Sequence, residues 1–210
     1  QFFHQLFQVL MVGLTIGMMR TVIPALAESE FGVPRNSFVL LTSFVIAFGF
    51  VKGTLNFVAG RLSERIGRKL VLLIGWIAAL PIPAMVLWAP SWDWIVGATV
   101  LLGVNQGLTS MLDITTPDQR GLAIGLNEFS GYIGVAAAGI VTGYLASAFG
   151  ARQGVALFGI ITIVVAFALT LLWVRETLAW AHSEAKKHAA GLSDVSPRYP
   201  KNISDRPSTF

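Results

Sequence analysis

Long apolar stretches constrain this chain more than any other feature of its sequence. A helix that crosses a membrane needs roughly 20 consecutive, mostly apolar residues. Stretches of this kind occur at residues 3–27, 37–59, 70–88, 92–112, 122–148 and 151–174. The breaks between them are short and contain turn-forming residues, so each stretch is expected to run antiparallel to the next. Residues 1–174 are therefore predicted to form an all-α, multi-pass membrane domain of six transmembrane helices.

The composition excludes several other classes of protein. Of the 210 residues, 54% are apolar and only 12% are charged, roughly half the charged fraction of an average soluble domain. An apolar fraction this high also excludes a disordered chain. The chain contains no cysteine, which excludes a small secreted scaffold held together by disulfides. The lipid bilayer is therefore the predicted surroundings of residues 1–174.

The segment from 175 to 210 differs in composition from the rest of the chain. It is charged as far as Ala190, and beyond Gly191 it is rich in Pro and Ser. Such a composition cannot bury enough apolar surface to form a core. We expect a polar cytoplasmic tail, or the start of a central loop, that is largely disordered at its end.

The basic residues predict an orientation in the membrane. Most Lys and Arg residues fall in the second and fourth breaks and in the segment 175–210, whereas the segments at the opposite ends of the stretches hold only Arg35 and Arg152. Cytoplasmic loops carry an excess of Lys and Arg. This rule places both termini in the cytoplasm, with the chain in the plasma (inner) membrane. The net charge of +4 then reflects topology, and no nucleic-acid partner is predicted.

The break after the second stretch carries a distinctive pattern of glycines, leucine and charges. Its residues are Gly60, Leu62, Glu64, Arg65, Gly67, Arg68 and Lys69. The two glycines permit a tight reversal between helices, and Glu64 lies among four cations. A carboxylate held there could cap a helix or bridge to basic side chains, and so act as a latch for one conformation of a moving protein. An ordinary basic loop that obeys the charge rule is the alternative.

This pattern resembles the motif Gly-x-Leu-x-Asp-Arg-x-Gly-Arg-Lys that the major facilitator superfamily of secondary transporters carries between its second and third helices, with Glu64 in place of the Asp. Residues 117–121, Pro-Asp-Gln-Arg-Gly, are similar to the inner loop between the fourth and fifth helices of that family. The resemblance covers residues 3–176 and implies one half of the family's fold, six helices arranged as a 3+3 inverted repeat. It also implies that the chain is a fragment or half, whose partner is a second six-helix half in the same chain or in another.

The fourth stretch departs from the pattern of the family. Members often carry Arg-x-x-Gln-Gly there, whereas Gly103 stands at the Arg position before Gln106 and Gly107. A role for that arginine in proton transfer is therefore not carried over to this chain. The distance from Gln106 to Arg120 is also several residues shorter than is usual for the family.

Three polar residues are predicted to share one layer inside the membrane. Lys52, Asn105 and Glu128 each lie roughly 10 to 12 Å from the inner end of their helix, at 1.5 Å of rise per residue. A charge at a helix centre costs about 2.5 to 3.5 kcal/mol on insertion scales, so we expect Lys52 and Glu128 to face the protein interior. The layer is either a proton- or substrate-responsive site, with Lys52 and Glu128 as candidates for proton coupling, or a set of structural contacts.

Arg20 is a candidate for the substrate pathway, together with Asn105 and Gln106. It lies in the first stretch, after Gly13 and Gly17, and its permanently charged guanidinium suits an anionic substrate group. In the alternative interpretation, its long side chain reaches the outer membrane interface. The resemblance favours the pathway, because it implies that the first and fourth helices lie beside the central route.

These features predict a secondary active transporter that moves a small molecule or ion by alternating access, driven by an ion gradient, with protons as the expected ion. The three histidines have no metal-ligand spacing, and no catalytic grouping or nucleotide-binding motif is present. We therefore expect no metal, no cofactor and no enzymatic activity. The alternative is a polytopic membrane protein that binds or scaffolds partners without moving a solute.

Overall fold

The computed structural model describes residues 2–34, 37–109 and 120–174. The described residues form seven helices: α1 (Phe2–Ser29), α2 (Phe38–Ile66), α3 (Arg68–Ala79), α4 (Ile82–Leu87), α5 (Trp92–Thr109), α6 (Arg120–Phe149) and α7 (Ala151–Trp173). Five helical spans in these ranges are long and apolar enough to cross a membrane: Phe3–Ser29, Val45–Ile66, Arg68–Leu87, Gly121–Phe149 and Ala151–Trp173. The predicted all-α, multi-pass membrane fold is confirmed. The predictions made for residues 117–119 and 175–210 lie outside the described residues.

The second helix is longer than predicted. We expected it to end near Ala59 and a loop to follow from Gly60, but α2 continues to Ile66 and α3 begins at Arg68. Most residues between Gly60 and Ile66 are good helix formers, and one glycine does not outweigh them. Between α2 and α3, only Gly67 leaves the helical conformation. Its φ is 90°, a value that is unfavourable for residues with a Cβ atom. The predicted reversal therefore takes place at Gly67 alone.

The third predicted stretch, 70–88, is not one continuous helix. A turn at Leu80 and Pro81 separates α3 from α4. Proline has no backbone N–H and its ring collides with the carbonyl group four residues earlier, so it interrupts a helix at this point. The two pieces together still form one span, Arg68–Leu87.

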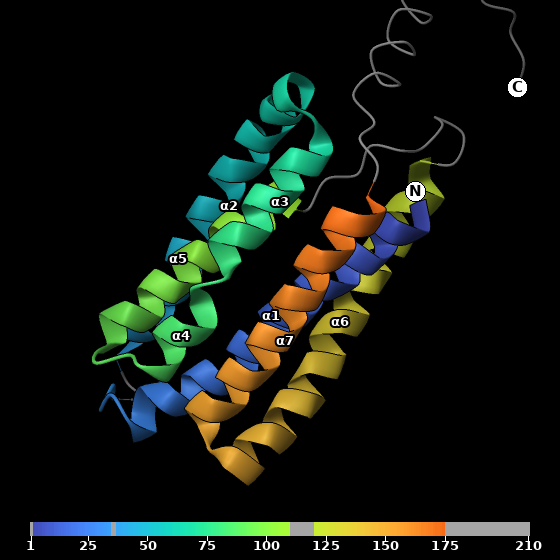
Figure 1. The fold of residues 1–210 in the computed structure, drawn as a ribbon. Coiled ribbons are helices and arrows are strands. Elements are labelled where there is room, and N and C mark those ends of the chain that lie inside the picture. The colour runs from blue at the N-terminus through green and yellow to red at the C-terminus, as the bar shows by residue number, and fades with distance from the viewer. Residues whose placement is uncertain (1, 35–36, 110–119, 175–210) are drawn as a thin grey trace, which may run out of the picture. The chain divides into compact units, whose positions relative to one another are not determined.

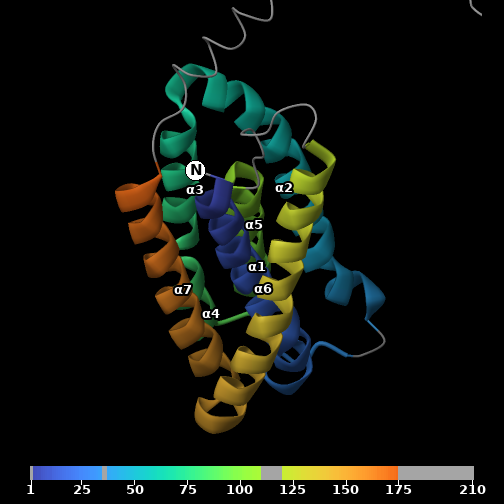
Figure 2. The same ribbon diagram turned by 90° about the vertical axis from the view of Figure 1, so that its right-hand side faces the viewer.

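The helices pack in two groups that resemble each other. α1 packs along α6, and α2 packs along α5, while α7 and the pair α3–α4 cover the far side of these contacts. Figure 1 shows α2 to α5 on one side and α1, α6 and α7 on the other, and Figure 2 shows α7 at the left margin, α2 at the right margin and α6 in front between them. Take α1, α2 and the pair α3–α4 as the first repeat, and α5, α6 and α7 as the second. When each element is replaced by its counterpart in the other repeat, the contact of α1 with α6 becomes the contact of α5 with α2. This is the packing expected of a 3+3 repeat.

Glycines allow the paired helices to approach closely. A Cβ atom on Gly13 would lie 2.1 Å from the carbonyl oxygen of Gly131, and one on Gly107 would lie 2.6 Å from Cβ of Leu55. Both positions therefore require glycine for the observed contact between helices. In two glycine pairs with a spacing of four residues, Gly49 and Gly53 and then Gly121 and Gly125, a Cβ atom on either member would meet nothing within 4 Å among the described residues. These four glycines all lie on α2 or α6.

The apolar core lies between α1, α3, α4, α5 and α7. Its largest fully buried side chains include Trp76, Met18 and Ile163. The indole of Trp76 donates a hydrogen bond of 3.0 Å to Oε1 of Gln8, which satisfies both buried groups. α2 and α6 contribute little to this core and are the least buried of the membrane spans.

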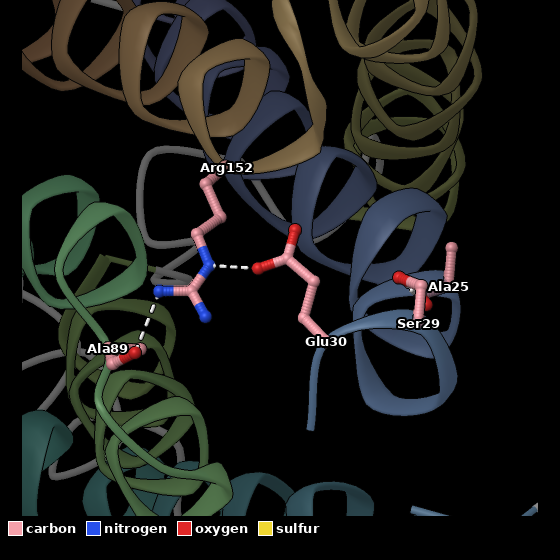
Figure 3. A network of polar contacts seen from close by, with 5 residues as sticks. All are labelled: Ala25, Ser29, Glu30, Ala89 and Arg152. Atoms are coloured by element: carbon pink, nitrogen blue, oxygen red, sulfur yellow. Dashed lines mark hydrogen bonds and ion pairs between the residues drawn. The ribbon is translucent and has the colours of Figure 1, made fainter. Parts of the chain in front are cut away.

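Two basic side chains, Lys69 and Arg152, join α7 to other parts of the helical domain. At one end, the Lys69 ammonium donates a hydrogen bond of 2.7 Å to the carbonyl oxygen of Leu171. At the other, the Arg152 guanidinium forms an ion pair with Glu30 and donates a hydrogen bond of 2.7 Å to the carbonyl oxygen of Ala89 (Figure 3). Both contacts cross between the first three membrane spans and the last. They hold α7 against its neighbours at both of its ends.

Candidate functional site: a charged cavity between four helices

Each of four helices turns one polar face toward a shared cavity. On α1, Gly13, Ile16 and Arg20 follow one another at spacings of three and four residues, which places them on one face. On α2, Lys52 and Asn56 are four residues apart in the same way. The faces of α5 and α6 complete the cavity.

The cavity has a volume of about 310 Å³. The charged residues that line it come from three helices: Arg20, Lys52 and Glu128. Its uncharged polar lining consists of Asn56, Gln106, Asn127 and Tyr132. Of the five residues predicted as pathway or coupling residues, the structure therefore brings four to one cavity, and Asn105 is the exception.

The charged groups of the cavity interact without forming direct pairs. The Lys52 ammonium is close enough to Glu128 and Arg20 for an electrostatic interaction with each. Among the described residues, however, none of the three has an ion-pair or hydrogen-bond partner. The Lys52 ammonium lies 5.8 Å from the centre of the Phe48 ring, a weak cation–π contact. Two cations and one carboxylate thus face the cavity, with a formal net charge of +1 when Glu128 is ionised.

Gln106 connects the cavity to the framework of the protein. Its side chain is fully buried, and its amide nitrogen donates a hydrogen bond of 2.9 Å to the carbonyl oxygen of Val12 on α1. This bond fixes the orientation of the amide, because a carbonyl oxygen accepts only from the nitrogen. The oxygen Oε1 of Gln106 has no partner among the described residues. Oδ1 of Asn127, also buried, has none there either.

Asn105 faces α3 and not the cavity. Its amide nitrogen donates a hydrogen bond of 3.0 Å to the carbonyl oxygen of Gly75 on α3. The side chain is fully buried and does not line the cavity. It fastens α5 to α3, which is the structural role that the sequence had left open for the polar layer.

Arg20 lies at the boundary between two spaces. Besides the main cavity it lines a smaller one of about 40 Å³, between α1, α2 and α5, whose other lining residues include Phe48 and Thr99. The side chain is largely exposed. A permanently charged group is therefore part of the lining of both spaces.

The predicted latch residues lie away from this cavity, around the junction of α2 and α3. Glu64 and Arg65 are exposed on the last turn of α2. The Arg61 guanidinium lies 5.0 Å from the centre of the Phe57 ring on the same helix. Among the described residues no partner is recorded for the Glu64 carboxylate.

Tyr132 is a cavity residue that the sequence interpretation missed. It follows Glu128 by four residues, so both lie on the same face of α6. That spacing, applied from Glu128, would have identified it. Within the described ranges no group of three or more His, Asp or Glu residues is arranged to hold a metal ion.

Comparison with known proteins gives two matches. The family model described as the Major Facilitator Superfamily matches residues 6–207. The proton-coupled antiporter flippase LtaA of Staphylococcus saprophyticus is 31% identical over 99 residues, which are 45% of this chain and 25% of that protein. The match thus spans about a quarter of the length of this curated relative.

Proposed function

Because the chain belongs to the Major Facilitator Superfamily, we propose that it forms part of a secondary active transporter that moves a small solute across a membrane by alternating access. The observation that carries this proposal is the cavity lined by Arg20, Lys52 and Glu128 between helices long and apolar enough to span a bilayer. Charged residues inside a membrane are costly and are typical of substrate and ion pathways. We propose the plasma membrane as the location, with both termini in the cytoplasm as the charge rule predicts.

A second six-helix half is the proposed partner of this domain. The helices α2 and α6 flank the cavity and carry exposed large apolar side chains, among them Phe50, Phe57 and Ile140. The open glycines Gly49 and Gly125 lie on the same two helices. Small residues at helix surfaces let a neighbouring helix approach closely in lipid. These faces are suited to a partner that closes the cavity from the other side.

Glu128 and Lys52 are the proposed coupling residues. A carboxylate that faces a cavity beside two cations changes the net charge of that cavity when it binds a proton. The relative from S. saprophyticus is described as proton-coupled, which supports the choice of ion. The substrate pathway is proposed to contain Arg20 and Gln106, with Asn105 as a support behind Gln106.

The conformational latch is proposed at the junction of α2 and α3. Glu64, Arg65 and Arg68 supply its charges, and Gly67 supplies the sharp reversal that presents them together. The exposed carboxylate of Glu64 is available to a second half in one state of the transport cycle.

The test of transport measures solute accumulation in proteoliposomes. Vesicles containing the protein together with its second six-helix half are incubated with a cytosolic metabolite extract under pH gradients of either direction, and mass spectrometry identifies what accumulates inside. We expect at least one solute to accumulate above its equilibrium level with the wild-type protein. Glu128→Gln should abolish that accumulation, because the side chain keeps its shape but can no longer take up a proton.

A matched carboxylate variant serves as the control. Asp93 lies exposed at the start of α5 and does not line the cavity. Asp93→Asn should therefore accumulate the same solute as the wild-type protein. Gradient-driven accumulation by Glu128→Gln at the wild-type level would refute the coupling role, and no accumulation by the wild-type protein would refute transport.

A further inference from the structure

We infer that the substrate of this cavity is a small organic anion that also carries hydroxyl or N–H groups. The inference rests on the proposed function, because it names the class of solute for the same site. It draws on two independent observations, the unpaired charges of the cavity and two buried oxygens that lack hydrogen-bond donors.

The charges favour an anion. The Arg20 guanidinium and the Lys52 ammonium both face the cavity and have no ion-pair partner among the described residues. Both groups only donate hydrogen bonds, and they need acceptor groups once the cavity closes. Glu128 balances one of the two charges at most. A carboxylate or phosphate group on the substrate would balance the other and could take two parallel bonds from Arg20.

The buried amide oxygens require donors. Gln106 and Asn127 line the cavity, and Oε1 of Gln106 and Oδ1 of Asn127 are buried without a partner among the described residues. The residues are 0% and 7% exposed, respectively. A buried acceptor left without a donor costs about 1 to 3 kcal/mol, so a ligand that supplies hydroxyl or N–H groups gains affinity there. A simple inorganic anion has acceptors only and cannot satisfy these oxygens.

The dimensions of the cavity favour a small solute. Its volume of about 310 Å³ is at the lower end of the range for ligand sites, which is roughly 300 to 1,000 Å³. The polar groups are flanked by apolar side chains of α1 and α6, among them Val9, Val12 and Val135. Once a second half closes the cavity, apolar walls of this kind strengthen the interaction of a bound anion with the cations.

The charge preference is measurable without a known substrate. The 210 residues contain no cysteine, so Ile16→Cys introduces one thiol on the cavity face of α1, four residues before Arg20. The purified protein is treated with methanethiosulfonate reagents that carry either a sulfonate or a trimethylammonium group, without a gradient. The ratio of the two reaction rates is compared with the same ratio for a free thiol in solution. We expect this cavity thiol to favour the sulfonate reagent.

Charge variants of Ile16→Cys show whether the named cations cause this preference. Arg20→Gln should reduce the ratio about fivefold, the size expected for one charge several ångströms from the thiol in a watery cavity. Arg20→Lys should retain most of the preference, and Arg20→Gln combined with Lys52→Gln should reduce it further. A cavity thiol that prefers the trimethylammonium reagent, or a ratio that does not change in Arg20→Gln, would overturn the inference. Neither result depends on whether the protein transports a solute.

The donor requirement is tested by binding to the purified protein. Gluconate carries a carboxylate and hydroxyl groups, acetate carries only the carboxylate, and glucose carries only the hydroxyl groups. We expect gluconate to raise the midpoint of thermal unfolding more than either of the others at equal concentration. Asn127→Leu should remove the advantage of gluconate over acetate, because it removes the unpaired acceptor at similar volume. Equal shifts with gluconate and acetate, or a larger shift with glucose, would refute the assigned class.

Discussion

At the scale of single residues, neighbouring positions on one helix have different roles. Asn105 and Gln106 are adjacent in α5, yet one bonds to α3 and the other lines the cavity between α1 and α2. Successive residues of a helix point about 100° apart, so a shared depth in the membrane does not give a shared neighbour. The sequence could predict which polar residues fall inside the long apolar stretches. The direction of each side chain could not be predicted, because it depends on which helices are adjacent.

Gly134 provides a prediction at this scale. A Cβ atom there would lie 2.4 Å from the carbonyl oxygen of Leu10 and 3.1 Å from Cα of Gly13. Both are backbone atoms, so Gly134→Ala must push α6 away from α1. We expect a loss of about 1 to 3 kcal/mol of stability. It would appear as a lower midpoint of thermal unfolding, followed by tryptophan fluorescence in detergent micelles.

Gly143→Ala is the matched control on the same helix. A Cβ atom at that position meets no heavy atom within 4 Å among the described residues. The variant should keep the wild-type stability or gain up to about 1 kcal/mol, because alanine favours the helix more than glycine. If both variants lose the same stability, close packing of α1 against α6 is not the reason that Gly134 is required.

At the scale of helices, the sequence interpretation was wrong about which residues end or interrupt a helix. The sequence contains glycines at 60 and 67, and both were predicted to belong to a loop. Of these two glycines, only Gly67 has a positive φ, and Gly60 lies inside α2. The conformation of a glycine cannot be predicted from its identity, because glycine is compatible with both helix and turn. The break between α3 and α4, in contrast, could have been predicted from Pro81, because proline interrupts a helix.

Gly67→Ala tests the junction of α2 and α3. At a φ of 90°, alanine places its Cβ against the backbone, a strain of roughly 1 to 2 kcal/mol. We expect a lower midpoint of thermal unfolding than in the wild-type protein. Gly60→Ala is the control, because Gly60 is helical and a Cβ there would meet no atom within 4 Å among the described residues. Loss of stability in Gly60→Ala but not in Gly67→Ala would contradict the described junction.

At the scale of the whole molecule, the helical, multi-pass fold could be predicted and the contacts between helices could not. Length and hydropathy predicted a multi-pass helical domain, and the spacing of Gly60 to Lys69 indicated the family that the family model then matched. Which helices pack together is set by side-chain shape. The approach of Gly107 to Leu55 and of Gly13 to Gly131 illustrates this, since glycine at these positions permits contact without specifying the partner.

The proposed latch belongs to this scale, because it acts on the transport cycle. Glu64→Ala should slow turnover severalfold while leaving the binding of a transported solute nearly unchanged, since Glu64 does not line the cavity. The measurement compares transport rates in proteoliposomes with equilibrium binding in detergent. Glu64→Asp is the control that keeps the acid and should retain most of the turnover. Wild-type turnover in Glu64→Ala would exclude the latch.

The junction at Gly67 also bears on how the domain can move. A single residue, Gly67, separates α2 from α3, so the connection between the two helices is as short as it can be. We therefore expect α3 to move when α2 tilts. The charged residues around Gly67 would then move together with both helices. α3 is in turn tied to the end of α7 through Lys69. We therefore expect a movement of α2 to be accompanied by a movement of α3 and of the end of α7 that Lys69 contacts.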